Sequence, residues 1–145
     1  MQNLPQETLT LEQVQQRVPL LKRVVRDAAA VYESRRKSKE LLEDFVVISK
    51  KFNSPEISET VSRLRRDIAQ FDRDLDTYRN EVRSLGGVLR DEGQGLTYFA
   101  AEREEREIYL IWELDEPDLL SWHGREQTLS DRVPVEFPEG SQAPG

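Results

Sequence analysis

The feature that most constrains this chain is an apolar heptad repeat in its middle. Apolar residues recur at alternating steps of four and three at Ile57, Val61, Leu64, Ile68, Phe71, Leu75, Tyr78, Val82 and Leu85. This spacing puts a single apolar stripe along an α-helix, and the stripe has to pack against another helix. Ser54 and Pro55 are typical of a helix start, and Gly86-Gly87 of a helix end. The repeat therefore predicts a helix about 47 Å long with a helical partner.

The partner helix is expected directly upstream. Thr10 is a favourable N-cap, and Gln13 three residues later completes a capping box. A proline inside a helix loses a hydrogen bond and clashes with the preceding turn, so Pro19 predicts either a short first helix or a kink. The longer helix that follows carries Leu21, Val24, Ala28, Val31, Leu42 and Phe45 at steps of three and four.

Two polar residues, Arg35 and Ser38, interrupt the apolar stripe of this first helix. The connection near Asn53 is short, which favours an antiparallel, coiled-coil-like hairpin over residues 10–85. Since the imperfect stripe leaves apolar surface uncovered, we expect the helices to pair with a second copy of the chain as a homodimer.

The pattern changes after Gly87, and residues 87–135 are expected to form a small antiparallel β-sheet of three or four strands. Apolar and aromatic residues alternate from Leu96 to Phe99 and again over "IYLIW", residues 108–112. Residues 102–107 are interpreted as a charged hairpin turn. Leu119–His123 is expected to form a further strand, with Pro117 ending the strand before it. The fold class is therefore α+β, with a single domain over residues 1–135 and a disordered tail over residues 136–145.

Composition excludes several function classes. A net charge of −7 disfavours nucleic acid and anionic membranes as partners. The absence of cysteine excludes disulfides, thiolate nucleophiles and cysteine-ligated metals. The longest apolar run, "IYLIW", is far too short to span a bilayer, and the first ten residues lack the pattern of a signal peptide. We therefore expect a cytoplasmic location.

The candidate site residues are Asp91, Glu116, His123 and Arg132, with Trp112 and Trp122 as aromatic core or stacking residues. Imidazole and carboxylates are usual ligands of divalent metals when cysteine is absent. Alternatively, Glu116 orients His123 as a general base while Arg132 binds an anionic substrate. In the structural alternative, His123 bonds to Glu116 or to a backbone carbonyl, and Arg132 fixes the C-terminal segment through Asp91 or Glu116. The two tryptophans are expected to supply the apolar area that a small sheet needs.

The C-terminal third carries a set of residues with a characteristic order and spacing: Asp91, Gly95-Leu96, Phe99, Tyr109-Leu110, Trp112, Leu114, Glu116-Pro117, Trp122-His123 and Arg132. In order and spacing these residues resemble a bacterial family called domain of unknown function 2203. The chain departs from the family pattern at Ile111, where the family has cysteine, and at Asp115 and Asp131, where it has glycine. The resemblance supports the architecture and the choice of residues, and it implies no activity.

These observations favour a non-catalytic, self-associating interaction or scaffold module without a cofactor. Two alternatives remain. One is a protein that binds a divalent metal or a small anion around Glu116, His123 and Arg132, and the other is a hydrolase-like enzyme that uses the same residues.

Overall fold

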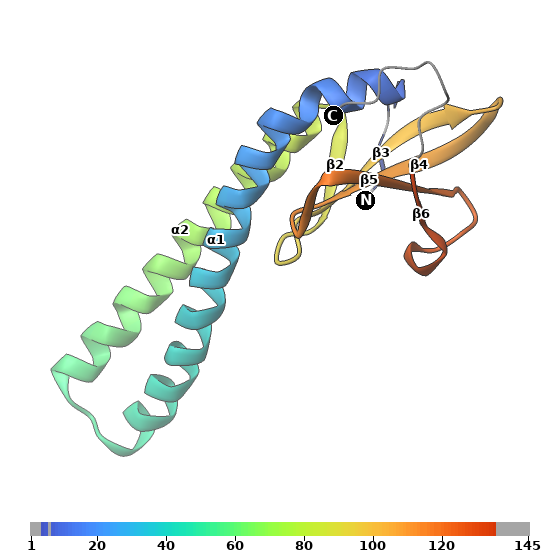
Figure 1. Cartoon of the computed structure of the whole chain (residues 1–145). Helices are drawn as coiled ribbons and strands as arrows, with labels where there is room; N and C mark the ends of the chain where they lie inside the picture. Colours follow the sequence, from blue (N-terminus) through green and yellow to red (C-terminus); the bar gives the residue numbers. More distant parts are fainter. Residues whose placement is uncertain (1–3, 6, 136–145) are drawn as a thin grey trace.

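Two long helices followed by a sheet make up the protein in a computed structural model that describes residues 4–5 and 7–135 (Figure 1). The predicted tail, residues 136–145, lies outside the described residues. The elements are β1 (Thr8–Leu9), α1 (Leu11–Lys51), α2 (Pro55–Ser84), β2 (Gly87–Asp91), β3 (Leu96–Arg103), β4 (Arg106–Glu113), β5 (Glu116–Gly124), the 3-10 helix η1 (Leu129–Asp131) and β6 (Val133–Pro134). This order confirms the predicted α+β class. Within the described part of the chain, neither long helix holds an apolar stretch suited to crossing a membrane.

The helical hairpin forms where the heptad repeat and the caps place it. The Thr10 hydroxyl accepts the Gln13 N–H at 3.0 Å, and the Gln13 side chain accepts the Thr10 N–H at 2.9 Å. The Ser54 hydroxyl caps α2 by accepting the Ile57 N–H at 3.2 Å. Pro19 lies inside the continuous helix α1, whose first turns bend away from the axis of the rest (Figure 1). The kink alternative therefore describes α1, because the helix continues through the proline.

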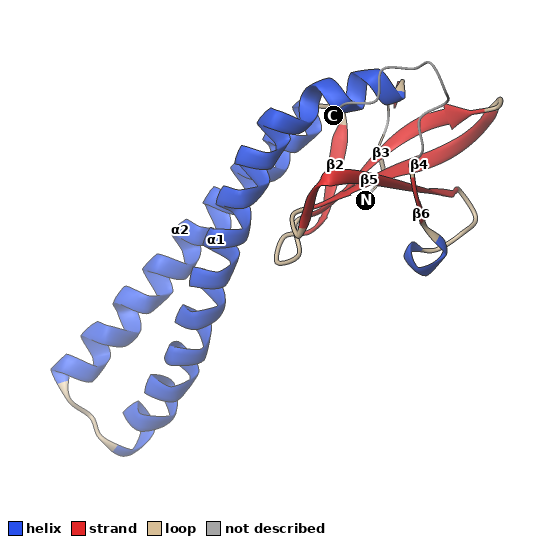
Figure 2. Cartoon of the chain, in the orientation of Figure 1, coloured by secondary structure: helices blue, strands red, loops and turns tan. Residues whose placement is uncertain are grey.

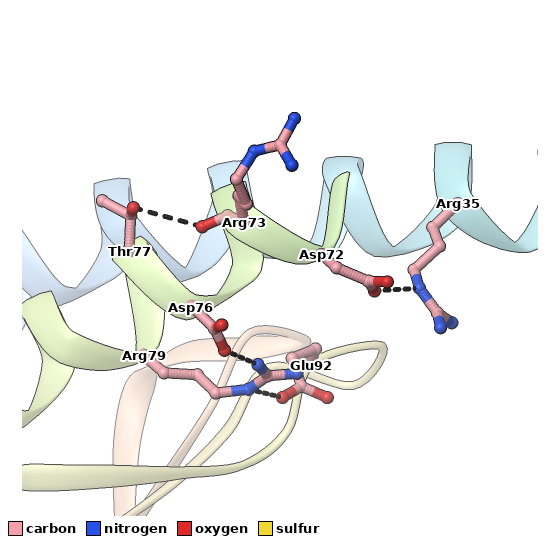
Figure 3. Close-up of polar contacts among 7 residues, drawn as sticks. All are labelled: Arg35, Asp72, Arg73, Asp76, Thr77, Arg79 and Glu92. Carbon is pink, nitrogen blue, oxygen red and sulfur yellow. Dashed lines mark hydrogen bonds and ion pairs between the residues drawn. The ribbon is translucent and has the colours of Figure 1, made fainter. Parts of the chain in front are cut away.

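The two helices extend well beyond the sheet (Figure 1), and we call the projecting part, residues 35–72, the arm. At the base of the arm, Arg35, one of the two polar residues that interrupt the apolar stripe of α1, pairs with Asp72 on α2. Arg35 Nε lies 2.5 Å from Asp72 Oδ1 (Figure 3). The arm's own buried apolar residues are Val61 and Leu64 on α2. The arm is therefore a two-helix structure with a thin core.

Six strands form the sheet (Figure 2), two of them only two residues long. Antiparallel pairing links β2 to β3, β3 to β4, β4 to β5 and β5 to β6. The short strand β1 pairs in parallel with β3, Thr8 beside Ala100 and Leu9 beside Ala101. Since β2 pairs with Leu96 to Phe99 on the same strand, β1 and β2 share one edge of β3. The sheet is thus mixed, and neither β1 nor β6 was predicted from the sequence.

The sheet has one face against the helices and one face turned away from them, which we call the open face. On the helix side, Trp112, Phe99 and Leu110 pack with Val25, Ala28 and Val82 in one buried cluster. On the open face, a second cluster contains Leu96, Tyr98, Tyr109 and Ile111. This division confirms the predicted alternation along residues 108–112. Leu129 of η1 packs against the second cluster, so the chain's own C-terminal segment covers part of the open face.

Two loop predictions need correction. The charged hairpin turn is shorter than residues 102–107, since only Glu104 and Glu105 separate β3 from β4. Pro117 does not end a strand region, because it lies inside β5. The ladder between β4 and β5 is irregular there: the pairing shifts from Glu113 with Glu116 to Trp112 with Leu120. An irregular stretch accommodates a residue that has no N–H to donate.

An ion pair fastens α2 to the sheet (Figure 3). Arg79 Nε lies 2.6 Å from Glu92 Oε2 in the turn after β2, and Arg79 Nη1 lies 2.7 Å from Asp76 Oδ1. Although desolvation opposes it, these two carboxylates raise the pKa of Arg79. The contact holds the β2–β3 turn against the helix.

Candidate functional site

His123 is the centre of the polar group on the open face, near the C-terminal end of β5. Its side chain is 3 % exposed. Nδ1 lies 2.7 Å from the Gly124 carbonyl oxygen, and Nε2 lies 3.2 Å from the Tyr98 hydroxyl. Because a carbonyl only accepts, Nδ1 carries the proton of the neutral ring, and Nε2 then accepts the Tyr98 O–H. Both ring nitrogens are therefore engaged within the protein.

The two rings joined by this hydrogen bond pack together with a third ring, that of Tyr109. The ring centroids of Tyr98, Tyr109 and His123 lie 5.5 to 5.7 Å from one another, and His123 meets both tyrosines edge-on. Tyr109 is the direct cross-strand neighbour of His123 on β4, and β3 supplies Tyr98. Burial raises the pKa of the Tyr98 phenol, although nearby arginines act in the opposite direction. The phenol therefore stays protonated at neutral pH and can donate to His123.

These rings form the wall of a cavity of about 590 Å³, which we call the open-face cavity. Its apolar lining comes from Leu4, Leu96 and Leu129, and its polar lining from Arg90, Asp91, Arg125, Gln127 and Thr128. A register shift between Leu89 and Asp91 in β2 sets both Arg90 and Asp91 opposite Leu96. Bulges of this kind redirect side chains, and here the bulge brings both charged residues to the cavity.

The arginines and the aspartate of the cavity differ in their partners. The Arg90 guanidinium carbon lies 4.8 Å from the centroid of the Tyr98 ring. Arg125 pairs with Glu107, and its pKa is raised first by its polar contact with the Tyr109 hydroxyl and then by Glu107. Asp91 Oδ1 accepts the Gln94 N–H at 2.9 Å within the turn that follows. No carboxylate within residues 4–5 and 7–135 lies within 4.0 Å of the Arg90 guanidinium nitrogens.

The structure separates the predicted site residues into two groups. His123 and Asp91 both line the open-face cavity. Glu116 begins β5 and faces Glu113 across the hairpin, seven residues and roughly 23 Å of strand from His123. Glu116 therefore does not orient His123 within one chain. Arg132 ties the C-terminal segment down, as the structural alternative predicted, but its partner is Glu113: Arg132 Nη2 lies 2.8 Å from Glu113 Oε1.

Both tryptophans belong to the helix-facing side of the sheet. Trp112 is fully buried, and its indole N–H donates to the Pro117 carbonyl oxygen at 3.0 Å. Trp122 is half-buried, with the Arg103 guanidinium carbon 4.7 Å from the centroid of its ring. Trp112 therefore has a core role and also braces the β4–β5 connection, while Trp122 lies at the border of the same core.

The arrangement bears on the metal and general-base hypotheses. In the described part of the chain, no three histidine, aspartate or glutamate side chains come together in a metal-binding group. His123 uses both nitrogens in protein hydrogen bonds, so either role would require it to give up one of them. The chemistry offered by the cavity is an aromatic wall with guanidinium groups beside it.

Four arginine and tyrosine residues of the cavity were not among the candidate site residues: Arg90, Tyr98, Tyr109 and Arg125. A partial signal existed for the tyrosines, because alternation places Tyr98 and Tyr109 on the face opposite the core-facing residues of their strands. Their position beside His123 depends on strand register, which alternation does not give. No comparable signal existed for the arginines. Their placement depends on the β2 bulge and on the path of the chain after β5.

The fold and the cavity define a class of small α+β proteins in which a long helical hairpin covers one face of a sheet and the other face holds an aromatic, arginine-flanked cavity. Residues 7–135 match the family model described as Uncharacterized conserved protein (DUF2203), and the chain belongs to this family. The comparisons with curated proteins and with solved structures found no match.

The positions where the chain departs from the family signature fit the structure without strain. Ile111 is 1 % exposed in the open-face cluster. Asp115 lies in the β4–β5 turn and is not among the residues with positive φ, so this conformation does not require glycine there. Asp131 accepts the Thr128 N–H at 2.9 Å and caps η1. The two aspartates therefore leave the geometry of both turns intact.

Proposed function

We propose that this protein is a non-catalytic interaction module that self-associates through its helical arm. The observation that carries the proposal is an apolar stripe at the C-terminal end of α1 whose residues are largely exposed. Leu41 is 43 % exposed, Ile48 37 % and Phe52 63 %. Phe45, which also belongs to the stripe toward α2, is half-buried, and Phe52 is the C-cap of the helix. Together the four residues follow steps of four, three and four, which puts them along one side of this end of α1.

A second copy of the same arm is the partner that suits this stripe. In an antiparallel pairing of two α1 helices, Leu41 of one copy meets Phe52 of the other, and Phe45 meets Ile48. Along the border of the stripe, Asp44 of one copy then lies beside Lys51 of the other, and the two-fold axis repeats the pair. The charges are therefore complementary, and the pairing would convert two thin hairpins into a four-helix bundle.

Charge reversal tests the pairing and its direction. In Lys51→Glu, the new carboxylate faces Asp44 of the other copy twice per dimer, so we expect the dimer dissociation constant to rise about tenfold. Adding Asp44→Lys restores opposite charges and should recover most of the loss. Sedimentation equilibrium over a range of protein concentrations measures both effects.

Lys50→Glu is the matched control, because Lys50 is exposed on the side of α1 away from the stripe and the change in charge is identical. Ile48→Glu should give monomer, since it puts a carboxylate into the apolar contact. The proposal fails if the unmodified protein is monomeric at micromolar concentration, or if Lys50→Glu and Lys51→Glu weaken the dimer equally.

A further inference from the structure

We propose that the open-face cavity binds a small organic acid, with the acid's apolar or aromatic body against the tyrosines and its carboxylate on Arg90. This inference is independent of self-association through the arm. The cavity belongs to the sheet, and its lining contains no residue of α1 or α2.

The size and walls of the cavity match such a ligand. A volume of about 590 Å³ lies within the usual range for small-molecule sites. Tyr98 and Tyr109 line the cavity from neighbouring strands with the small part of each ring that is exposed, 6 % and 8 % of the residue, and Leu96 and Leu129 complete the lining. The lining is about equally polar and apolar, so it offers apolar contact together with polar groups that can fix the orientation of a ligand.

Arg90 supplies the charge that selects an acid. Its guanidinium carbon lies 4.8 Å from the centroid of the Tyr98 ring, and the planar guanidinium offers N–H groups that match a carboxylate in bidentate geometry. The other charged groups near the cavity already have partners: Arg125 has Glu107, Arg132 has Glu113, and Asp91 has the Gln94 N–H. Among residues 4–5 and 7–135, Arg90 is therefore the cavity cation that has no carboxylate partner.

The Tyr98–His123 hydrogen bond keeps the wall in place. Tyr98 donates to His123, and His123 donates to the Gly124 carbonyl, so this chain of bonds fixes the planes of both rings. A ligand thus meets a preformed aromatic surface, which lowers the entropy lost on binding. We assign His123 a positioning role for the wall, and Arg90 the direct contact with the ligand.

The single histidine of the chain provides a reporter for the test. The imidazole nitrogen signals of His123 can be followed by NMR while benzoate, benzyl alcohol or inorganic phosphate is added to the full-length protein. We expect benzoate to shift these signals in a saturable manner. Benzyl alcohol lacks the charge and phosphate lacks the apolar body, so each should bind at least tenfold more weakly.

Arg90→Gln should weaken benzoate binding at least tenfold, equivalent to about 1.4 kcal/mol. Arg103→Gln is the matched control, because Arg103 stacks over Trp122, outside the open-face cavity, and the change in charge is the same. The proposal is overturned if millimolar benzoate leaves the His123 signals unchanged. It is also overturned if benzyl alcohol or phosphate binds as tightly as benzoate, or if the two variants lose affinity equally.

Discussion

Gly95 shows how one residue fixes the approach of the β2–β3 turn to the rest of the fold. Its φ is +66°, in the left-handed region that favours glycine. A Cβ at this position would lie 2.6 Å from the Leu114 Cβ and 2.8 Å from the Val25 Cγ1. The turn therefore packs directly against α1 and the β4–β5 connection, which explains the glycine in physical terms.

We expect Gly95→Ala to lower the free energy of unfolding by roughly 3 kcal/mol, since strain from positive φ and overpacking both contribute. Urea unfolding followed by tryptophan fluorescence measures the change. Gly124→Ala is the control, because the nearest atom to its added Cβ is the flexible Gln127 Oε1, 3.3 Å away. Equal losses in the two variants would contradict this account.

The residue scale also shows why the candidate site was only partly predictable. His123 and Asp91 stand out by chemical type, and both line the open-face cavity. Of the two partners expected for His123, the backbone carbonyl is confirmed, since Nδ1 lies 2.7 Å from the Gly124 carbonyl oxygen. Glu116 is wrong, because it is near His123 in sequence but occupies the other end of the same strand. The true neighbours of His123, Tyr98 and Tyr109, come from other strands. Identifying them requires strand register, which residue type alone does not give.

At the scale of elements, the turn between β3 and β4 has an unfavourable sequence for its shape. Glu104 and Glu105 have φ of +54° and +66°. Two positive values at the centre of a two-residue hairpin define a type I′ turn, which favours Asn-Gly. Glutamate has a Cβ that is crowded at positive φ, so this backbone conformation is less favourable for Glu104 and Glu105 than for glycine or asparagine.

Replacing both residues, Glu104→Asn with Glu105→Gly, should therefore raise the free energy of unfolding by about 1 kcal/mol. Chemical denaturation measures the gain. Glu102→Gly serves as the comparison: Glu102 is extended in β3, where glycine weakens a strand. A double variant no more stable than the unmodified protein would show that the turn conformation is not under strain.

Elements with a strong periodic signal were predicted correctly. The heptad repeat, the two caps and the alternation over residues 108–112 each depend on local sequence, and the structure has the corresponding helices and faces. The strands β1 and β6 were missed because each has only two residues and is defined by its neighbour in the sheet. Such short strands carry no period that a sequence could display.

At the scale of the whole molecule, packing is concentrated at one end. The large buried cluster joins the sheet to α1 from Val14 to Ala28 and to α2 at Leu75 and Val82. The arm lies beyond this cluster and contributes Val61 and Leu64 as its buried residues. The large buried cluster contains no residue of the arm, so the packing of the cluster does not depend on how long the arm is.

Shortening the arm by two heptads in each helix, by deleting residues 38–51 and 55–68, keeps the register and the native connection at residues 52–54. We expect the shortened protein to retain the near-UV circular dichroism of its buried tryptophan, because Trp112 packs in the large buried cluster, which contains none of the deleted residues. It should also sediment as a monomer, because Leu41 and Ile48 are removed. Loss of the near-UV signal would mean that the arm supports the core.

The parallel pairing of Thr8–Leu9 with Ala100–Ala101 has a consequence for biosynthesis. A ribosome adds about 5–20 residues per second, so β1 emerges roughly 5–20 seconds before its neighbour exists. During that interval the helical hairpin of α1 and α2 can form from local contacts alone. The strand β3, with which β1 will pair, has not yet been translated. The pairing of β1 with β3 therefore cannot form until residues 96–103 have been translated, well after β1 itself.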